Sequence, residues 1–137
     1  MKELVTIKQT LKELKPELVK NFHVSSIDVL GSIVRNDFSE ILEGTGSLVL
    51  DRQNKIAYAC LSERTSLNLF LHWCSRMEYS PVYFSATNEA VPIYHTNVVM
   101  TIATDFVMVC LECISDKQEQ LALKESLIKS GRRVLEI

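Results

Sequence analysis

The chain has 137 residues, of which 47% are hydrophobic and 23% charged, and its formal net charge is -2. These values are typical of one globular domain with one core. The slight negative charge gives no electrostatic reason to bind nucleic acid or an anionic membrane, and polar residues interrupt the longest apolar stretch, residues 98–114. We therefore expect a cytoplasmic protein with no nucleic-acid partner and no membrane partner.

The first predicted element is an N-terminal helical segment over residues 1–23. Leucine and isoleucine recur at three- and four-residue steps between residues 4 and 18, which predicts an amphipathic helix. Pro16 conflicts with an unbroken helix, so we expect it to end or kink the helix. A short strand is predicted at residues 26–30, within a second segment that spans residues 24–137.

A regular order of elements follows a tight turn at Gly44 and Gly46. The apolar pattern then predicts a hairpin, a helix capped by Thr65 or Ser66, and a strand. The predicted ranges are 48–50, 56–61, 67–77 and 81–86.

The same order of elements is predicted a second time. A hairpin is expected first, then a helix that a capping box at residues 115–118 opens and Gly131 closes, and then a strand. The hairpin strands are 98–103 and 106–114, the helix ends at Lys129, and the strand is 134–137. The order β-β-α-β thus occurs twice, which predicts an α/β fold with a structural repeat. Because the chain ends inside the last predicted strand, we expect it to be one piece of a longer fold.

The four cysteines are Cys60, Cys74, Cys110 and Cys113. Cys110 and Cys113 have the spacing of half a zinc site, but no second pair completes it. In a strand, positions three apart point to opposite faces, which also prevents chelation. We therefore expect buried free thiols and no bound metal or cofactor.

Charged side chains lie at the ends of two apolar stretches. Glu43 precedes two glycines that permit close approach to a ligand, and a carboxylate there could accept paired N–H bonds from a guanidinium. Arg64 lies between a predicted strand and helix, where its planar fork suits a substrate carboxylate. The alternatives are a solvated turn for Glu43 and, for Arg64, a surface pair with Glu63 or Glu78.

His95 and Asn97 form a third candidate group. If residues 95–102 form a strand, the period of two places both side chains on one face, where His95 could transfer protons and Asn97 could orient the imidazole or contact a substrate. The alternative is a structural, half-buried histidine at the start of a strand.

Three ordered motifs, at residues 43–47, 62–66 and 94–98, carry a family resemblance. They resemble the signatures of the arginine deiminase-related, amidinotransferase-like proteins of the pentein superfamily, and the resemblance covers roughly residues 24–137. It implies a propeller of five ββαβ modules, of which this chain holds about two, so that residues 24–137 would be a partial pentein domain. It also implies no cofactor and a small guanidino or ureido amino acid as substrate.

The resemblance implies a chemistry and a set of roles. A cysteine thiolate of such hydrolases attacks the guanidino or ureido carbon of an arginine- or citrulline-like amino acid. By motif, His95 matches the catalytic histidine, Glu43 the guanidinium-binding acid and Arg64 the carboxylate-binding arginine. Asn97 matches a substrate-binding position that is Asp in many deiminases.

The nucleophilic cysteine of the family lies in a Gly-rich segment that has no match in this sequence. Without it covalent catalysis is not available, and we expect the chain to be inactive alone. We also expect an oligomer or a partner chain to cover the exposed module edges. The alternative function is a non-catalytic pentein-like binding or protein-interaction module.

Overall fold

The computed structural model describes residues 9, 13, 16, 32–34 and 40–137. The chain divides into two units, Met1–Leu30 and Gly31–Ile137. In the first unit the three described residues have helical backbone, and Gln9 Nε2 donates to Glu13 Oε1 one turn away (2.9 Å). The rest of the predicted N-terminal helix, the strand at residues 26–30 and the boundary after residue 23 lie outside the described residues.

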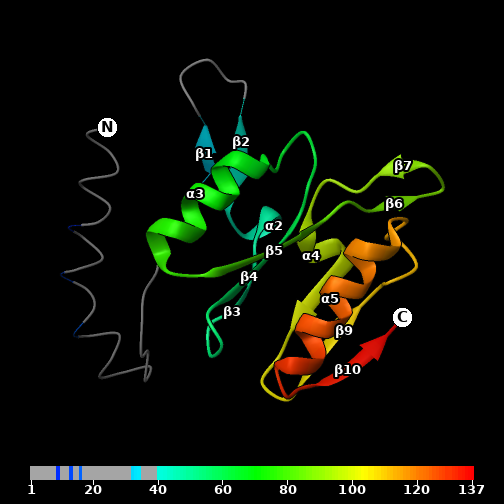
Figure 1. Ribbon diagram of the computed structural model, residues 1–137. Helices are drawn as coiled ribbons and strands as arrows, with labels where there is room; N and C mark the ends of the chain where they lie inside the picture. Colours follow the sequence, from blue (N-terminus) through cyan, green and yellow to red (C-terminus); the bar gives the residue numbers. More distant parts are fainter. Residues whose placement is uncertain (1–8, 10–12, 14–15, 17–31, 35–39) are drawn as a thin grey trace. The chain divides into compact units, whose positions relative to one another are not determined.

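The first β-β-α-β order is confirmed (Figure 1). Its elements are β3 (Val49–Asp51), β4 (Ile56–Cys60), α3 (Leu67–Met77) and β5 (Ser80–Phe84). Strand β4 lies in the centre of the sheet, antiparallel to β3 and parallel to β5. Ser66 is the N-cap of α3, and its hydroxyl accepts a hydrogen bond from the backbone N–H of Leu69.

The second β-β-α-β order is also confirmed, with the same connectivity. Its elements are β8 (Met100–Ile102), β9 (Phe106–Val109), α5 (Lys117–Lys129) and β10 (Arg133–Glu136). Strand β9 is antiparallel to β8 and parallel to β10. The prediction that β9 reaches residue 114 is wrong, because a turn closed by Ile114 N–H and Leu111 O follows Val109.

The N-cap of α5 is Asp116, one residue later than a capping box at residues 115–118 would place it. Its carboxylate accepts hydrogen bonds from the backbone N–H groups of Gln118 and Glu119. A carboxylate cap also suits the positive end of the helix dipole. Gly131 follows the helix with a φ of 78°, a conformation that glycine adopts without steric cost.

Short elements connect and flank these two sheets. They are β1 (Ser32–Val34), β2 (Ile41–Glu43), α2 (Gly44–Ser47), β6 (Thr87–Asn88), β7 (Val91–Pro92) and α4 (Thr96–Val99). Strands β1 and β2 form one antiparallel pair, and β6 and β7 form another. Where a tight turn was predicted the chain makes a single helical turn, α2, with Gly44 at a φ of 43°. In the part of the chain that the structure describes, no helix has the length and apolar character to cross a membrane.

Strand β4 is buried on both faces and separates two apolar cores. Tyr58 and Cys60 point into a core shared with β9 and α5, whereas Ala57 and Ala59 belong to a core shared with α3. This division follows from the two-residue period of a strand. A strand buried on both faces carries no polar alternation, which explains why β4 reads as a continuous apolar run.

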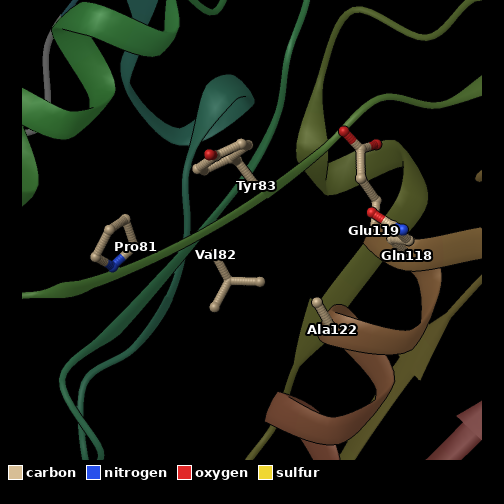
Figure 2. Close-up of a pocket in the computed structure, with 6 residues that line it drawn as sticks. All are labelled: Pro81, Val82, Tyr83, Gln118, Glu119 and Ala122. Atoms are coloured by element: carbon tan, nitrogen blue, oxygen red, sulfur yellow. The ribbon is translucent and has the colours of Figure 1, made fainter. Parts of the chain in front are cut away.

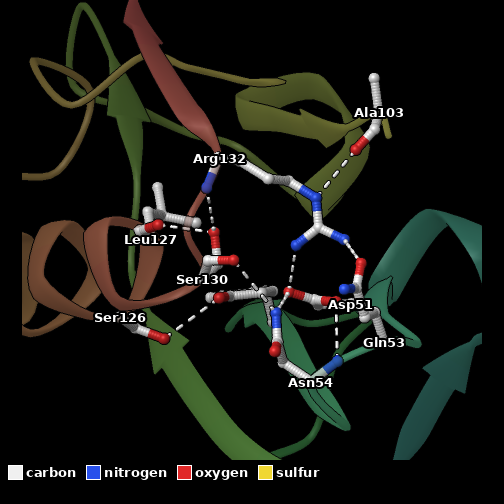
Figure 3. A network of polar contacts seen from close by, with 9 residues as sticks. Asp51, Gln53, Asn54, Ala103, Ser126, Leu127, Ser130 and Arg132 are labelled. Atoms are coloured by element: carbon white, nitrogen blue, oxygen red, sulfur yellow. Dashed lines mark hydrogen bonds and ion pairs between the residues drawn. The ribbon is translucent and has the colours of Figure 1, made fainter. Parts of the chain in front are cut away.

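A buried ion pair joins the two β-β-α-β units (Figure 3). Arg132 Nη1 donates to Asp51 Oδ2 at 2.6 Å, and the two side chains are 9% and 0% exposed. Asp51 ends β3 of the first unit, while Arg132 lies between α5 and β10 of the second. The guanidinium also donates to Ala103 O after β8 (3.0 Å) and to Gln53 Oε1 (3.4 Å). One side chain therefore contacts the ends of both sheets.

The environment of Asp51 favours its charged form. Burial is the largest single effect, and by itself it raises the pKa of Asp51. Hydrogen bonds from the side chain and backbone of Asn54, together with the hydrogen bond and charge of Arg132, lower the pKa by more than burial raises it. The net result is a pKa below the ordinary value of an aspartate. The pair is thus ionised at neutral pH.

Replacing Arg132 by alanine should lower the free energy of unfolding by about 3–5 kcal/mol, because it leaves the Asp51 carboxylate buried without a cation. Chemical denaturation monitored by circular dichroism measures this. Arg133→Ala is the matched control, since Arg133 is an exposed neighbour in β10, and its effect should stay within about 0.5 kcal/mol. Equal losses for the two variants would contradict the role assigned to the pair.

Acid should remove the contribution of Asp51. Because its pKa is lower in the folded chain, this contribution is complete above about pH 4 and is lost as the pH falls through the folded pKa. Urea midpoints between about pH 6 and about pH 2 should fall more steeply for the natural chain than for Asp51→Asn. The double variant Asp51→Asn/Arg132→Gln avoids an unpaired buried arginine and should show the same shallower decline. If the urea midpoints of both variants fall with pH as steeply as those of the natural chain, Asp51 is not a source of the acid sensitivity.

Candidate active site

Glu43, Arg64 and His95, one from each of the three motifs, converge. Glu43 ends β2, Arg64 lies in the loop between β4 and α3, and His95 immediately precedes α4. Glu43 Oε2 lies 2.7 Å from His95 Nε2 and 3.7 Å from Arg64 Nη1. An ionised carboxylate can only accept, so the imidazole donates from Nε2.

The three side chains are reachable from solvent. Glu43 and His95 are 30% and 31% exposed, and Arg64 is 54% exposed. The Arg64 guanidinium carbon lies 5.8 Å from the centre of the Tyr94 ring, within the range of a cation–π contact. A small molecule could therefore contact a carboxylate, an imidazole and a guanidinium at one place.

The backbone beside Glu43 and Arg64 is held by a buried hydroxyl. Ser47 Oγ accepts hydrogen bonds from Glu43 N–H (2.9 Å) and from Thr65 Oγ1 (2.7 Å), and it donates to Arg64 O (3.0 Å). Ser47 and Thr65 are 0% and 1% exposed. Because a buried polar group without a partner is costly, these bonds restrict the backbone to one arrangement.

A second buried hydroxyl fixes the residue after His95. Thr96 Oγ1 donates to Ser47 O (2.5 Å) and accepts from Cys60 N–H (2.7 Å). Thr96 is fully buried, and the described residues contain no buried side-chain polar atom without a partner. Each charged site residue thus has a hydroxyl residue in its own segment, and these hydroxyls bond the three segments together. Sequence reasoning missed this role of Ser47, Thr65 and Thr96, although each stands one to four residues after a candidate.

Gly46 leaves the space that the imidazole occupies. A Cβ atom built on Gly46 would lie 3.0 Å from His95 Cδ2 and 3.2 Å from Nε2. The φ of Gly46 is not positive, so its backbone conformation does not favour glycine. A glycine is needed here because a side chain would collide with the imidazole ring.

The expected strand at residues 95–102 is wrong, and with it the placement of Asn97 beside His95. Residues Thr96–Val99 form the helical turn α4, and strand β8 begins only at Met100. Asn97 is exposed and makes no side-chain hydrogen bond with the other described residues. The two-residue period therefore does not apply, and Asn97 does not orient the imidazole.

Two of the cysteines are buried free thiols, as predicted. Burial raises the pKa of Cys60 and of Cys74 to about 11. Cys110 and Cys113 are only partly buried, and their sulfur atoms face each other 2.7 Å apart, so the prediction that they point to opposite faces is wrong. In the part of the chain that is described, no group of three or more His, Cys, Asp or Glu residues could hold a metal ion.

An open groove lies away from these charged residues, between β5 and α5 (Figure 2). Its volume is about 320 Å³. The lining residues are Pro81, Val82, Tyr83, Gln118, Glu119 and Ala122. None of the predicted site residues contributes to it, so the groove is separate from the candidate site.

Comparison with known protein families identifies the chain. Residues 3–137 match the family described as N,N dimethylarginine dimethylhydrolase, eukaryotic. The chain belongs to this family. Its membership in a family of arginine-modifying hydrolases confirms the resemblance drawn from the three motifs. A comparison with curated proteins finds no match.

Solved structures show the same fold. The N-terminal domain of ArgZ, an arginine dihydrolase from the ornithine–ammonia cycle in cyanobacteria, was solved as a mutant with bound substrate and aligns with a TM-score of 0.56 at 16% identity. The alignment covers 69% of this chain and 34% of the ArgZ domain. Full-length ArgZ without ligand aligns with a TM-score of 0.54 at 16% identity, over 69% of this chain and 15% of its own. The chain thus spans about a third of the length of the ArgZ domain.

Replacing Gly46 by alanine should displace the His95 ring from Glu43, because the new methyl group would crowd Cδ2 and Nε2. Imidazole resonances in ¹H–¹³C spectra report this, with His72 as an internal reference. Gly131→Ala is the matched control. A Cβ atom added at Gly131 would meet nothing within 4 Å, but an alanine at a φ of 78° should lower the free energy of unfolding by about 1–2 kcal/mol. Gly131→Ala should therefore destabilise the chain without moving the His95 signals. Unchanged His95 signals in Gly46→Ala would show that the glycine is not needed for the ring.

Proposed function

We propose that this chain supplies the guanidino-binding and proton-transfer part of an arginine-modifying hydrolase site. Glu43 holds the planar group of an arginine- or citrulline-like amino acid, Arg64 holds the substrate carboxylate, and His95 moves protons. The observation that carries the proposal is the 2.7 Å contact between Glu43 Oε2 and His95 Nε2, with the Arg64 guanidinium beside it. Dimethylated arginine is the substrate that the family suggests.

The contacts of Glu43 indicate how a ligand would enter. The ion pair with Arg64 is long, at 3.7 Å, and Arg64 is more than half exposed. Such exposed pairs are worth about 0–1 kcal/mol, so a ligand guanidinium can replace Arg64 at the carboxylate. Arg64 is then free to turn its planar fork to the carboxylate of the same ligand.

The role of His95 follows from the bond that has to break. Hydrolysis of a guanidino C–N bond adds water, leaves a carbonyl group on the carbon and releases an amine that needs a proton. An imidazole in contact with the acid that holds the guanidino group can give this proton and take one from the attacking water. We also propose that the exposed side chain of Asn97, two residues after His95, contacts the ligand.

We assign none of the described cysteines as the nucleophile that attacks a guanidino carbon at this site. Cys60 and Cys74 are buried thiols with a pKa of about 11, and Cys110 and Cys113 face each other. A thiolate is needed to attack a guanidino carbon. We therefore propose that the chain binds such ligands but does not turn them over alone.

The alternative is a non-catalytic module that binds another protein. It is supported by large apolar side chains that are exposed in the chain segment of His95: Tyr94 is 40%, Val91 60% and Val98 68% exposed. A partner chain or a second copy would cover these side chains. In that case, guanidino ligands should not bind.

Calorimetric titration with asymmetric dimethylarginine, arginine and citrulline tests the binding proposal. Glu43→Gln should weaken binding of the two guanidinium ligands by about 10- to 100-fold, because it removes a charge-assisted hydrogen bond. Glu63→Gln is the matched control, since Glu63 is an exposed acid next to Arg64, and it should leave affinity unchanged. No binding to the natural chain would overturn the proposal in favour of the interaction module.

The role of Arg64 is tested by removing its proposed partner from the ligand. Arg64→Ala should weaken arginine binding by about 10-fold or more but leave agmatine, which lacks the carboxylate, unaffected. Arg76→Ala on α3 serves as the control for loss of an exposed arginine. Equal losses for both ligands would show that Arg64 does not hold the carboxylate. Release of amine from dimethylarginine by the chain alone would contradict the absence of a nucleophile.

A further inference from the structure

The sulfur atoms of Cys110 and Cys113 meet outside the candidate site. Their Sγ atoms are 2.7 Å apart, and both residues are partly exposed. Strand β9 ends at Val109, and the turn that follows brings the two side chains to the same side. The other two cysteines, Cys60 and Cys74, are buried and lie in β4 and α3.

The backbone of this pair is held on three sides. Cys110 N–H donates to Val99 O (2.9 Å), Thr87 N–H donates to Cys113 O (2.8 Å), and the Gln120 side chain donates to Leu111 O (2.6 Å). These bonds involve the backbone, so they do not depend on the oxidation state of sulfur. The two thiols are thus held near each other before oxidation, and their Sγ atoms would have to close to the bonding distance of about 2.05 Å.

We propose that Cys110 and Cys113 form a reversible intramolecular disulfide when the chain meets a disulfide oxidant such as oxidised glutathione. This dithiol site is independent of the proposed hydrolase function. It consists of a C-x-x-C pair in the loop between β9 and α5, and its chemistry is thiol–disulfide exchange.

The exchange balances in two steps. The Cys110 thiolate attacks oxidised glutathione, a Cys110–glutathione bond forms, and one glutathione thiolate leaves. Cys113 then loses its proton and attacks the Cys110 sulfur, which releases the second glutathione thiolate. Two electrons pass from the dithiol to the oxidant.

The electrostatics of the pair support this order. A hydrogen bond with Cys110, and then burial, raise the pKa of Cys113 to about 11. Cys113 is therefore the member that keeps its proton until the second step. A backbone hydrogen bond joins the pair to the segment of His95, because Val99, which accepts the bond from Cys110 N–H, ends the helical turn that follows His95.

Tryptic peptides separate this pair from the other cysteines. The sequence has no lysine or arginine between Arg76 and Lys117, so residues 77–117 form one peptide that contains both thiols, whereas Cys60 and Cys74 fall in other peptides. The full chain is equilibrated at about pH 8 in buffers of reduced and oxidised glutathione, quenched with acid, denatured and alkylated with iodoacetamide. Mass spectrometry then counts the alkylated cysteines.

As the buffer becomes oxidising, peptide 77–117 should lose both alkylation sites together, by more than about tenfold, with the loss of two hydrogens. The peptides of Cys60 and Cys74 should remain alkylated, and dithiothreitol should restore both sites. In Cys113→Ser the second step is blocked, so Cys110 should instead carry one glutathione. In Cys74→Ser, the control, the pair should oxidise as in the natural chain.

Two results would overturn the proposal. One is that peptide 77–117 stays fully alkylated at every glutathione ratio. The other is that the disulfide of the natural chain joins Cys60 to either member of the pair, because Cys60 is the thiol whose charge also influences Cys113.

Discussion

The buried ion pair between Asp51 and Arg132 is the constraint that fixes one β-β-α-β unit against the other. Glu43 and Arg64 belong to the elements around the first sheet, while His95 precedes the second. The site exists only if the two sheets keep one relative position. A buried ion pair adds little net stability compared with apolar residues, but it tolerates few geometries, because each polar atom needs its partner. The hydrogen bonds of Arg132 to Ala103 and Gln53 impose the same geometric requirement at the ends of both sheets.

The hydroxyl of Thr96 also restricts the geometry near the site, because it is buried and needs both of its hydrogen-bond partners. It bonds to the carbonyl of Ser47 and to the backbone N–H of Cys60, so the segment of His95 is tied to both α2 and β4. The charged side chains are exposed enough to exchange partners, while the backbone that carries them is rigid. This division suits a site that binds a ligand, because the order of the backbone is already established before binding.

Elements that depend on local patterns could be predicted from the sequence. Helix Leu67–Met77 and its cap Ser66, and both hairpins, follow from periodicity and capping chemistry. The turn Thr96–Val99 could not, because its two valines favour a strand and only the distant bonds of Thr96 override them. Similarly, Asp51 and Arg132 are 81 residues apart, and no local pattern indicates that they meet.

The site itself was partly predictable for the same reason. Three charged residues stand at element ends within ordered motifs, so their convergence could be expected, and the contacts of Glu43 confirm it. The position of Asn97 was inferred from a strand that does not form. The hydroxyls that hold the site gave no separate signal, because serine and threonine are equally common at exposed turns.

The two buried faces of β4 also differ in size. Tyr58 fills one core, whereas Ala57 and Ala59 give the other only methyl groups, so α3 shares its core with the smallest side chains of the strand. Most of the volume of this core therefore comes from larger side chains outside β4, and a larger residue at either alanine position would have to displace some of them. Arg64 lies in the loop that joins β4 to α3. The two alanines, on the far side of the strand from the tyrosine, thus leave room for the core from which the loop of Arg64 departs.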